Sequence, residues 1–327
     1  MRTVRNATVV IVGASCGMGL ATALAFARGG SNLVLAARRE EELQKAVERC
    51  VVLGAQALHV VADITDPSAM QSVARTAVER FGQIDVWINM AGLSLWGRFE
   101  DIPPEAQARL IQVNLTGVIN GSHAAVQAMR GSGGSGVIVN VASFAGRIPV
   151  PFSTAYTASK YGVAGFTGAL RDELAVRSGI AVCGVYPTFV NTPTAVHSAN
   201  YTGRTLRPLP PLIEPEDVAE RIVRLAVRPR RALHLGLQHA LAPGYLLMPE
   251  MTGRFTSRLL QRFLFRSGPP AAVTNGLLFK PMAEGTGTRG RWGDIQQQWR
   301  RSARSIGTVG LAGVAALLLV RKAGRML

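Results

Sequence analysis

Three side chains in the middle of the chain could together carry out proton transfer. Ser143 lies thirteen residues before Tyr156, and Lys160 follows the tyrosine by four residues. Residues four apart face the same side of a helix, so the phenol and the ammonium group should project together. A nearby positive charge stabilises the phenolate by about 1–4 kcal/mol, which would lower a phenol pKa of about 10 by roughly one to three pKa units. Proton transfer near neutral pH then becomes feasible.

Tyr156 and Lys160 alone do not define an active site. A tyrosine and a lysine four residues apart are also typical of the surface of an ordinary amphipathic helix. Ser143 joins them only if a strand and a helix bring its hydroxyl to the same place as the phenol. The rest of the sequence must therefore supply the elements that position these side chains and a cofactor site beside them.

A glycine-rich turn near the N-terminus is typical of a dinucleotide-binding site. Residues 8–12 are apolar and rich in β-branched side chains, which favours a strand, whereas residues 20–28 are rich in alanine and favour a helix. Between them, the pattern G-x-x-x-G-x-G lacks the side chains that would obstruct a pyrophosphate near the positive end of the helix. The residues of this turn that we expect to contact the cofactor are Gly13, Ser15, Cys16, Gly17, Met18 and Gly19.

The end of the second predicted strand, 32–37, indicates which dinucleotide is bound. An acidic residue there would accept hydrogen bonds from the ribose hydroxyls of NAD, but Ala37 cannot do so. Arg38 and Arg39 could instead hold a 2′-phosphate through charge-assisted hydrogen bonds. We therefore expect NADP(H) as the cofactor. The alternative is that one arginine, more readily Arg39, is solvated and only caps the turn.

Strands and helices alternate along the chain, which is typical of a parallel, doubly wound α/β sheet. The predicted strands are 8–12, 32–37, 56–62, 84–88, 137–141, 180–186 and 232–235, and the predicted helices include 67–81, 103–129, 155–177 and 215–227. Ligands bind at the carboxyl ends of the strands in such a sheet. We therefore predict a Rossmann-like domain of about seven strands over residues 1–240, followed by a mainly helical C-terminal appendage.

The other cofactor-binding candidates follow predicted strands. They are Asp63 and Ile64 after the third strand, Asn89, Ala91 and Gly92 after the fourth, and Pro187, Val190 and Thr192 after the sixth. Asp63 could accept a hydrogen bond from the adenine amino group, while Val190 and Thr192 could meet the nicotinamide amide. Residues 193–214, rich in Pro, Thr and Ser, suit either a mobile substrate lid or an ordinary surface loop.

The predicted elements also position the three residues that could carry out proton transfer. Ser143 follows the predicted strand 137–141 and so lies on the ligand side of the sheet, and helix 155–177 carries Tyr156 and Lys160. Asn114 is a polar residue inside the apolar part of helix 103–129. From the sequence alone it could equally be a core amide that bonds to backbone or a member of the site.

Composition and charge limit the partners and the cellular compartment that we expect for this protein. The chain has 327 residues and a net charge of +16, most of it beyond residue 200, where 20 Lys and Arg residues face 7 Asp and Glu residues. We find no basic motif interleaved with aromatic residues, so nucleic acid is not expected as a partner. Cys16, Cys50 and Cys183 have no metal-ligand spacing, which indicates a reduced cytoplasmic setting without a metal site. The N-terminus has no long apolar region of the signal-peptide type.

Across roughly residues 5–240 the chain resembles the short-chain dehydrogenase/reductase family. The resemblance rests on an ordered set of motifs: Gly13-x-x-x-Gly17-x-Gly19, Asp63, Asn89-x-Ala-Gly92, Asn114, Ser143, Tyr156-x-x-x-Lys160, and Pro187 with Thr192. Four positions depart from the usual family pattern, namely Val12, Cys16, Met90 and Thr188. These departures affect cofactor loops and remove no proton-transfer group.

The resemblance implies a catalytic site that moves hydride between C4 of a nicotinamide and a carbonyl or alcohol carbon. In reduction, Tyr156 would be the general acid, and Ser143 would hydrogen-bond the substrate oxygen. Lys160 would hold the nicotinamide ribose and lower the tyrosine pKa. Asn114 would anchor a water that joins Lys160 to solvent. The family also suggests a dimer or tetramer.

Residues 241–300 are predicted to form a basic amphipathic extension and a linker. Arg254, Arg258, Arg262 and Arg266 recur at four-residue intervals, so they would form one stripe on a helix. Such a helix could pack on the enzyme domain, lie in a membrane interface, or cover the substrate entrance. Residues 269–292 are rich in Gly, Thr and Pro, which is typical of a linker or an irregular strap.

The last segment, 301–327, contains an uncharged apolar run at residues 306–320 with basic residues on both sides. As a helix this run would be about 22 Å long, short of the roughly 30 Å hydrocarbon core of a bilayer, although flanking basic side chains can reach the interface. A membrane anchor and a buried or oligomer-forming helix both remain open. With an anchor, the protein would sit on the cytoplasmic face of the membrane.

Together these patterns predict an NADP(H)-dependent carbonyl reductase or alcohol dehydrogenase that acts on a small apolar substrate. The residues expected near the substrate are Leu93, Leu95, Trp96, Phe152 and Phe189, although such residues are often plain core. Two other functions remain possible. One is a dinucleotide-sensing membrane-associated protein without turnover, and the other is an epimerase or dehydratase on the same scaffold.

Overall fold

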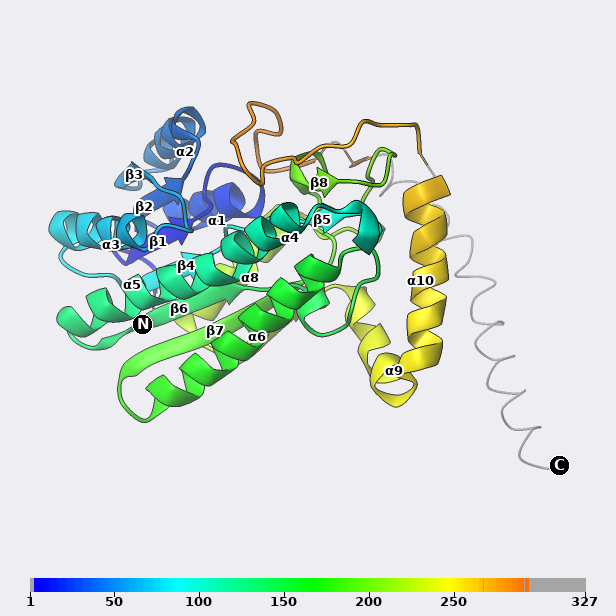
Figure 1. Cartoon of the computed structure of the whole chain (residues 1–327). Helices are drawn as coiled ribbons and strands as arrows, with labels where there is room; N and C mark the ends of the chain where they lie inside the picture. The colour runs from blue at the N-terminus through cyan, green and yellow to red at the C-terminus, as the bar shows by residue number, and fades with distance from the viewer. Residues whose placement is uncertain (1–2, 267, 291, 294–327) are drawn as a thin grey trace, which may run out of the picture.

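The described residues form a parallel sheet with helices on both faces (Figure 1). A computed structural model describes residues 3–266, 268–290 and 292–293. The seven strands are β1 (Thr8–Val12), β2 (Asn32–Ala37), β3 (Ala57–Val61), β4 (Val86–Asn89), β6 (Ser135–Val141), β7 (Gly179–Pro187) and β9 (Ala232–Leu235). Their order is β3-β2-β1-β4-β6-β7-β9, and every neighbouring pair is parallel. The predicted Rossmann-like, doubly wound fold is therefore confirmed.

Central strands are built from β-branched residues because both of their faces are buried. All five residues of β1, TVVIV, are buried, and the pattern fits a strand covered on both sides. Val9 and Ile11 pack into one core, whereas Val10 and Val12 pack into the other. The strand order reverses between β1 and β4, and in such sheets this reversal opens a crevice at the carboxyl ends.

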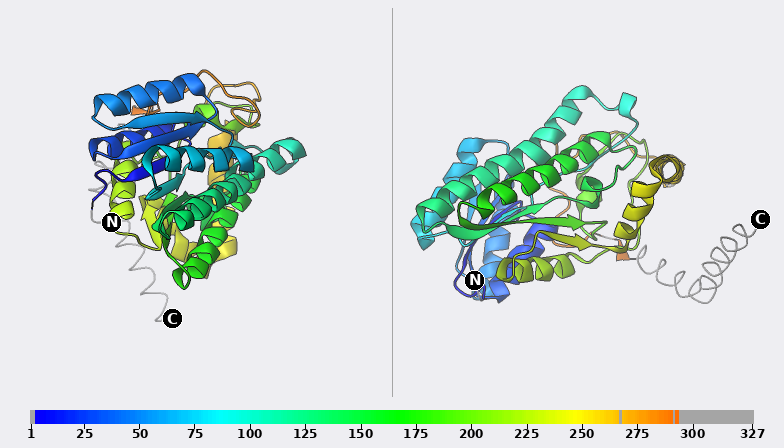
Figure 2. Two further views of the ribbon diagram at one scale, coloured as in Figure 1. Left: turned by 90° about the vertical axis from the view of Figure 1, so that its left-hand side faces the viewer. Right: turned by 90° about the horizontal axis from the view of Figure 1, so that it is seen from below.

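Two helical layers cover the sheet, and Figure 2 shows them on either side of the strands. One layer contains α1 (Gly17–Arg28), α2 (Glu40–Val52) and α8 (Pro215–Val227). The other contains α3 (Pro67–Phe81), α4 (Pro104–Ile111), α5 (Gly117–Gly131) and α6 (Thr154–Ala175). Local signals set some helix starts: the Asp66 side chain accepts a hydrogen bond from the Ser68 N–H, and Pro67 occupies the first turn of α3.

The long helix predicted for residues 103–129 is interrupted. Between α4 and α5 the chain makes a π-helical turn, η2 (Gln112–Thr116), and Asn114 lies inside this turn. Single π-helical turns inside α-helices occur frequently at functional sites. The predicted long helix is thus present, but a 3.6-residue pattern carries no signal for the one inserted residue of the π-helical turn.

Short elements complete the edge of the sheet where the strands end. They are β5 (Leu95–Trp96), β8 (Ala199–Asn200), α7 (Thr194–His197), η1 (Phe99–Asp101), η3 (Phe144–Gly146) and η4 (Leu237–Leu241). Strands β5 and β8 pair in parallel as a small second sheet. This sheet holds the loop after β4 against the segment after β7, so both loops border the crevice.

The C-terminal region packs on the same end of the sheet. Helices α9 (Ala242–Leu247) and α10 (Pro249–Arg266) are followed by irregular chain at residues 268–290, which we call the C-terminal strap. In Figure 1 the strap crosses from α10 back towards α2 over the short elements. Within the ranges described above, no helix is both long enough and apolar enough to cross a membrane. The predicted apolar helix 306–320 lies outside the described residues.

Candidate active site

The end of β6 and the start of α6 bring Ser143, Tyr156 and Lys160 together. Strand β6 ends at Val141, and Ser143 begins the short helix η3, where its hydroxyl accepts a hydrogen bond of 3.1 Å from the Ala145 N–H. Helix α6 begins at Thr154, which places Tyr156 in its first turn and Lys160 one turn further. The Ser143 hydroxyl and the Tyr156 phenol line the same cavity, close enough for the serine to lower the pKa of the tyrosine. The predicted cluster thus exists in the folded chain.

Lys160 is buried beside the tyrosine ring. Its Nζ lies 5.8 Å from the centroid of the Tyr156 ring and donates a hydrogen bond of 3.1 Å to the Val141 carbonyl oxygen. The lysine residue is 4% exposed, so its charge is removed from water. An ammonium group in such a place needs an anion or several acceptors to remain charged.

Burial sets the acidity of both groups. It raises the pKa of Tyr156, and the hydrogen bond from Ser143 offsets only part of this effect. Burial also lowers the pKa of Lys160 to about 8. The expected lowering of the tyrosine pKa by the lysine is therefore not found, because both side chains are desolvated and the charged form of each is disfavoured. The phenol remains protonated at neutral pH.

Asn114 is held rigidly at the centre of the site. Its Oδ1 accepts a hydrogen bond of 2.8 Å from the Leu93 N–H, and its Nδ2 donates to the Leu93 carbonyl at 2.9 Å. A third bond, of 3.1 Å, runs from Nδ2 to the Ser159 hydroxyl on α6. These bonds fit the core-amide explanation, yet Asn114 also borders the site. A Cβ atom at Gly92 would lie 3.4 Å from Asn114 Oδ1 and 3.2 Å from Lys160 Nζ.

The first of two cavities, of about 150 Å³, lies over the glycine-rich turn. Twelve of the predicted cofactor-binding residues line it: Gly13, Ser15, Cys16, Gly17, Met18, Gly19, Arg38, Arg39, Asp63, Ile64, Ala91 and Gly92. Two glycines are required here for space. Gly13 has φ +97°, and a Cβ atom there would lie 2.6 Å from the Ala91 nitrogen, while a Cβ atom at Gly19 would overlap the Gly13 carbonyl.

Six other predicted cofactor residues lie elsewhere. Asn89 is fully buried, with its side chain bonded to Trp87, Ser122 and Asn140. These hydrogen bonds fix the end of β4, from which the loop lining the cavity begins. The remaining five, Tyr156, Lys160, Pro187, Val190 and Thr192, line the neighbouring cavity. Met18, Gly92 and Thr194 line both cavities, so the two form adjoining parts of one crevice.

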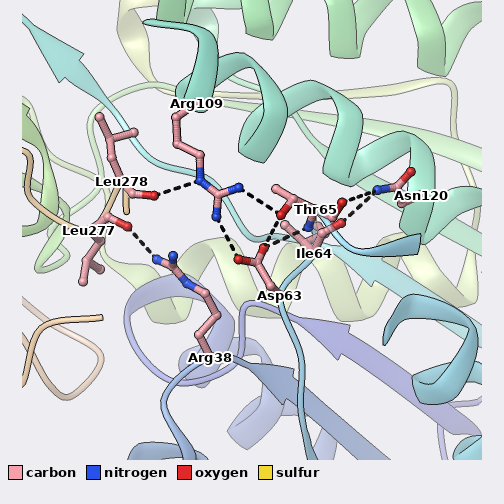
Figure 3. Close-up of polar contacts among 8 residues, drawn as sticks. All are labelled: Arg38, Asp63, Ile64, Thr65, Arg109, Asn120, Leu277 and Leu278. Carbon is pink, nitrogen blue, oxygen red and sulfur yellow. Dashed lines mark hydrogen bonds and ion pairs between the residues drawn. The ribbon is translucent and has the colours of Figure 1, made fainter. Parts of the chain in front are cut away.

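The arginines after β2 are half-buried, and both are bonded to the C-terminal strap. Arg38 Nη2 donates a hydrogen bond of 2.6 Å to the Leu277 carbonyl, and Arg39 Nη1 donates to the Met282 and Glu284 carbonyls at 3.2 Å each (Figure 3 shows the Arg38 contact). Arg39 does precede the first turn of α2, as the alternative expected, but it is half-buried and also bonded to the C-terminal strap.

Asp63 is already paired within the chain. Its Oδ2 lies 2.8 Å from Arg109 Nη2, and its Oδ1 accepts hydrogen bonds from the N–H and the hydroxyl of Thr65. Burial raises the pKa of Asp63, but the hydrogen bonds from Thr65 and Arg109 outweigh it, so the pKa is lowered overall. The carboxylate remains ionised at neutral pH. Arg109 was not among the predicted site residues, since nothing in helix 103–129 relates it to Asp63.

The second cavity, beside Tyr156, has a volume of about 180 Å³ and mostly apolar walls. Leu93, Trp96 and Phe189 line it as predicted. Leu95 is instead fully buried core, and Phe152 lies behind the wall, where its ring meets Phe265 edge-on at 5.2 Å. Other apolar residues of the wall were not named individually from the sequence, namely Val150, Leu206, Leu209, Leu260, Phe263 and Leu264.

Helix α10 therefore closes the substrate side of the crevice. Leu260 and Leu264 are buried against Leu206, and together with Phe263 they face the cavity. Of the three arrangements considered for the basic helix, packing on the enzyme domain and covering the substrate side are both seen. The predicted lid at residues 193–214 supplies Leu206 and Leu209 to the same wall.

The residues at the first cavity suit a dinucleotide. The glycine turn leaves a side-chain-free approach to the first turn of α1, where the N–H groups of Met18 and Gly19 lack partners within the helix and the Gly17 N–H is bonded to the Gly287 carbonyl. Arg38 and Arg39 supply fixed positive charge at the end of β2. Beyond Gly92 the crevice continues to Lys160 and Tyr156, so an extended ligand that lies along it reaches the phenol.

Comparisons with known proteins agree with this geometry. The model of the short chain dehydrogenase family matches residues 7–201. An uncharacterized oxidoreductase, YxnA, of Bacillus subtilis (strain 168) is 30% identical over 269 residues, which cover 82% of this chain and 75% of that protein. Cyclohexanol dehydrogenase of Acinetobacter sp. (strain SE19) is 35% identical over 221 residues, covering 67% of this chain and 87% of that protein. The crystal structure of a variant actinorhodin polyketide ketoreductase with NADPH has a TM-score of 0.64 and 29% sequence identity, covering 72% of this chain and 97% of the ketoreductase.

Proposed function

Since the chain belongs to the short-chain dehydrogenase/reductase family, we propose that it is an NADP(H)-dependent oxidoreductase acting on a carbonyl or secondary alcohol. The observation that carries this proposal is the meeting of Ser143, Tyr156 and Lys160 beside a glycine-lined crevice. When bound, the cofactor donates or accepts the hydride. The residues of the chain orient the substrate oxygen and move its proton.

Tyr156 is the general acid for reduction in this proposal. Burial keeps its phenol protonated, so the Oη–H can be donated to the carbonyl oxygen as hydride reaches the carbon. Ser143 Oγ, which lines the same cavity as the phenol, would hydrogen-bond that oxygen. In the oxidative direction the same oxygen atoms act in reverse, with the phenolate taking the alcohol proton.

Lys160 stabilises the phenolate that proton donation leaves behind. Its pKa of about 8 places it close to neutrality, so it can exchange a proton near physiological pH. The Nζ also lies where a ribose hydroxyl could accept a hydrogen bond, beside the open backbone at Gly92. Asn114 Oδ1 retains one lone pair after its bond to Leu93, and this lone pair can hold a water that links Lys160 to solvent.

The cofactor preference follows from the charge at the end of β2. Arg38 and Arg39 lie in the first cavity, and Ala37 offers no carboxylate for a ribose diol. A 2′-phosphate carries charge and acceptor oxygens that match guanidinium groups. We therefore assign NADP(H) over NAD(H). The NADPH named with the related ketoreductase structure supports this assignment.

The substrate that fits the second cavity is a small apolar ketone or secondary alcohol. Its walls are leucine, phenylalanine and tryptophan side chains, and the polar groups that face it converge on Ser143 and Tyr156. Such a cavity favours a compact hydrocarbon frame with one oxygen atom. The name of the Acinetobacter relative, cyclohexanol dehydrogenase, is in keeping with an alicyclic alcohol.

Steady-state assays of the full-length protein test this proposal. The oxidation of NADPH would be followed with a panel of cyclic and linear apolar ketones, for the wild type, Tyr156→Phe and Tyr161→Phe. Tyr161 lies on the same helix and is 40% exposed, so it is a matched control. We expect the rate of Tyr156→Phe to be about 10²–10³-fold lower than that of the wild type, because a general acid is removed. The rate of Tyr161→Phe should equal that of the wild type. Equal rates for the wild type and Tyr156→Phe would refute the mechanism.

A binding measurement separates this function from its alternatives. Tight NADPH binding without turnover of any ketone or alcohol would favour a dinucleotide-sensing protein. Product formation without net oxidation or reduction of the cofactor would favour an epimerase or dehydratase.

A further inference from the structure

The C-terminal strap, residues 268–290, is tied to the edge of the cofactor cavity at several points. The Gly17 N–H donates a hydrogen bond of 2.8 Å to the Gly287 carbonyl, and His197 Nε2 lies 3.1 Å from the Glu284 carbonyl. Residues Thr274 and Asn200 pair as an antiparallel bridge with backbone bonds of 3.0 and 2.8 Å. The strap is thus fixed at both ends of its passage over the cavity.

Between these anchors the strap presents carbonyl oxygens to three arginines. The Leu277 carbonyl accepts from Arg38 at 2.6 Å, and the Leu278 carbonyl accepts from Arg109 Nε at 3.1 Å. Figure 3 shows the two guanidinium groups side by side, with both carbonyls on the strap side and Asp63 on the other. The Met282 and Glu284 carbonyls hold Arg39, which also reaches the Ser15 hydroxyl at 3.4 Å.

Carbonyl partners orient an arginine without neutralising it. A guanidinium has five N–H donors, so one or two bonds to the strap leave donors free for a ligand. A carboxylate partner would cancel the charge, but a neutral carbonyl does not. Arg38 and Arg39 therefore keep their positive charge, whereas the charge of Arg109 is balanced by Asp63. Burial lowers the pKa of Arg38 most, the charge of Asp63 opposes this effect, and Arg109 and Arg39 lower the pKa further, so an added anion beside Arg38 would be favourable.

The strap forms a wall of the cavity and leaves it open. Leu277 and Pro281 line the cavity together with Arg38, Arg39 and Asp63, and about 150 Å³ remains between them. The wall stands at the end of β2, where the adenosine half of a dinucleotide would lie. It is far along the sequence from the residues that it orients, since 239 positions separate Arg38 from Leu277.

We propose that the C-terminal strap is a positioning element for the 2′-phosphate of NADP(H). The carbonyls of Leu277, Met282 and Glu284 hold Arg38 and Arg39 in the orientation that receives this phosphate, so the strap sets the preference for NADP(H) over NAD(H). The proposal rests on the proposed function insofar as the cavity must bind a nicotinamide dinucleotide. The group that the arginines would bind is a phosphate monoester on an adenosine ribose.

Gly276→Ala displaces the strap at the residue that precedes Leu277. Gly276 has φ +51°, and a Cβ atom there would overlap the His197 carbonyl and lie 2.6 Å from the Ser198 carbonyl, so the backbone must move. Gly82→Ala is the matched control. Gly82 also has a positive φ, +83°, but a Cβ atom there would meet nothing within 4 Å, and the residue caps α3 away from the strap. Gly287→Ala is a second strap variant with the same φ of +83° and the same open surroundings.

Equilibrium binding of NADPH and NADH would be measured by fluorescence titration on full-length proteins that unfold at similar temperatures. We expect Gly276→Ala to raise the Kd for NADPH about tenfold, because part of one charge-assisted contact is lost. The Kd for NADH should change less than twofold. Gly287→Ala should act in the same direction, while Gly82→Ala should leave both values unchanged. If the strap had only a structural role, Gly276→Ala would weaken the binding of both cofactors equally, and that result would overturn the proposal.

Hydrogen exchange on the wild-type protein gives a second readout that needs no variant. Saturating NADPH should slow amide exchange in residues 274–290 more than saturating NADH does, because only NADPH engages the arginines that the strap holds. Equal protection by both cofactors, or faster exchange with NADPH, would also overturn the proposal. If the wild type binds neither cofactor, the proposed function fails and the strap proposal with it. Binding without discrimination refutes the strap proposal alone.

Discussion

Arg109 Nη2 on α4 lies 2.8 Å from Asp63 Oδ2 in the loop after β3, and the two side chains are 19% and 32% exposed. The same guanidinium donates to the Thr65 hydroxyl at 3.0 Å and to the Leu278 carbonyl. One arginine thus joins the sheet edge, a helix of the second layer and the C-terminal strap. Because it is partly buried and makes several bonds, this pair should contribute more to stability than an exposed pair does.

Arg109→Met should lower the free energy of unfolding by about 1–2 kcal/mol at pH 7. The pKa of Asp63 is lowered in the folded state, so the stability that its charge supplies is present above the unfolded pKa and is lost as the pH falls through the folded value. The difference between wild type and variant should therefore shrink in acid. Urea unfolding at pH 7 and near pH 3.5 measures it, with the exposed Arg75→Met as control. A difference that is the same at both pH values would count against the pairing.

Lys160→Met should abolish the activity and raise stability at neutral pH. The folded pKa of about 8 lies below the ordinary 10.5, so burial of the charged form costs free energy at every pH below about 8. This cost is relieved as the pH rises from 8 to 10.5, where the unfolded lysine also loses its proton. We expect a gain of roughly 1–3 kcal/mol at pH 7, reduced by the lost bond to Val141. Urea unfolding at pH 7 and 9.5 should show this gain narrowing by pH 9.5, whereas a pH-independent effect would speak for simple repacking.

The parts of the fold that depend on local pattern could be predicted from the sequence. The strands at 8–12, 32–37 and 232–235 have the predicted bounds, because runs of β-branched and leucine residues between turn signals determine them locally. The order of the motifs then placed Ser143 and Tyr156 at one edge, since parallel strands end on the same side of a sheet. Twelve of the expected cofactor residues line one cavity for the same reason.

Contacts between distant segments could not be predicted from local pattern. No feature of the C-terminal strap relates Leu277 to Arg38, and the bond uses a backbone carbonyl, which every residue possesses. Similarly, the arginine spacing indicated the helix α10, but not that Leu260 and Leu264 would be buried against Leu206. The raised pKa of Tyr156 needs the burial of the whole site, so the spacing to Lys160 alone pointed in the opposite direction.

Arg38→Leu should weaken the binding of NADPH far more than the binding of NADH. Its guanidinium supplies fixed charge in the cavity at the end of β2, and a charge-assisted contact to phosphate contributes about 1.5–3 kcal/mol, or roughly 10–100-fold in affinity. The KM for NADPH should rise by this factor while the KM for NADH changes little. Arg49→Leu, at an exposed position on α2, is the control for the loss of one positive charge. Equal loss for both cofactors would show that Arg38 supports the loop and does not read the phosphate.

Leu264→Ala and Leu259→Ala should separate the two faces of α10. Leu264 is 6% exposed and faces the substrate cavity, whereas Leu259 on the same helix is 52% exposed. Removing the buried side chain should cost about 2–4 kcal/mol in the packing of α10 and enlarge the cavity, so the KM for small cyclic ketones should rise and larger ketones should be accepted relatively better. The exposed truncation should leave stability and KM nearly unchanged. Unfolding curves and KM values for a graded series of ketones measure both effects. If the two variants behaved alike, α10 would not form the wall of the substrate cavity in solution.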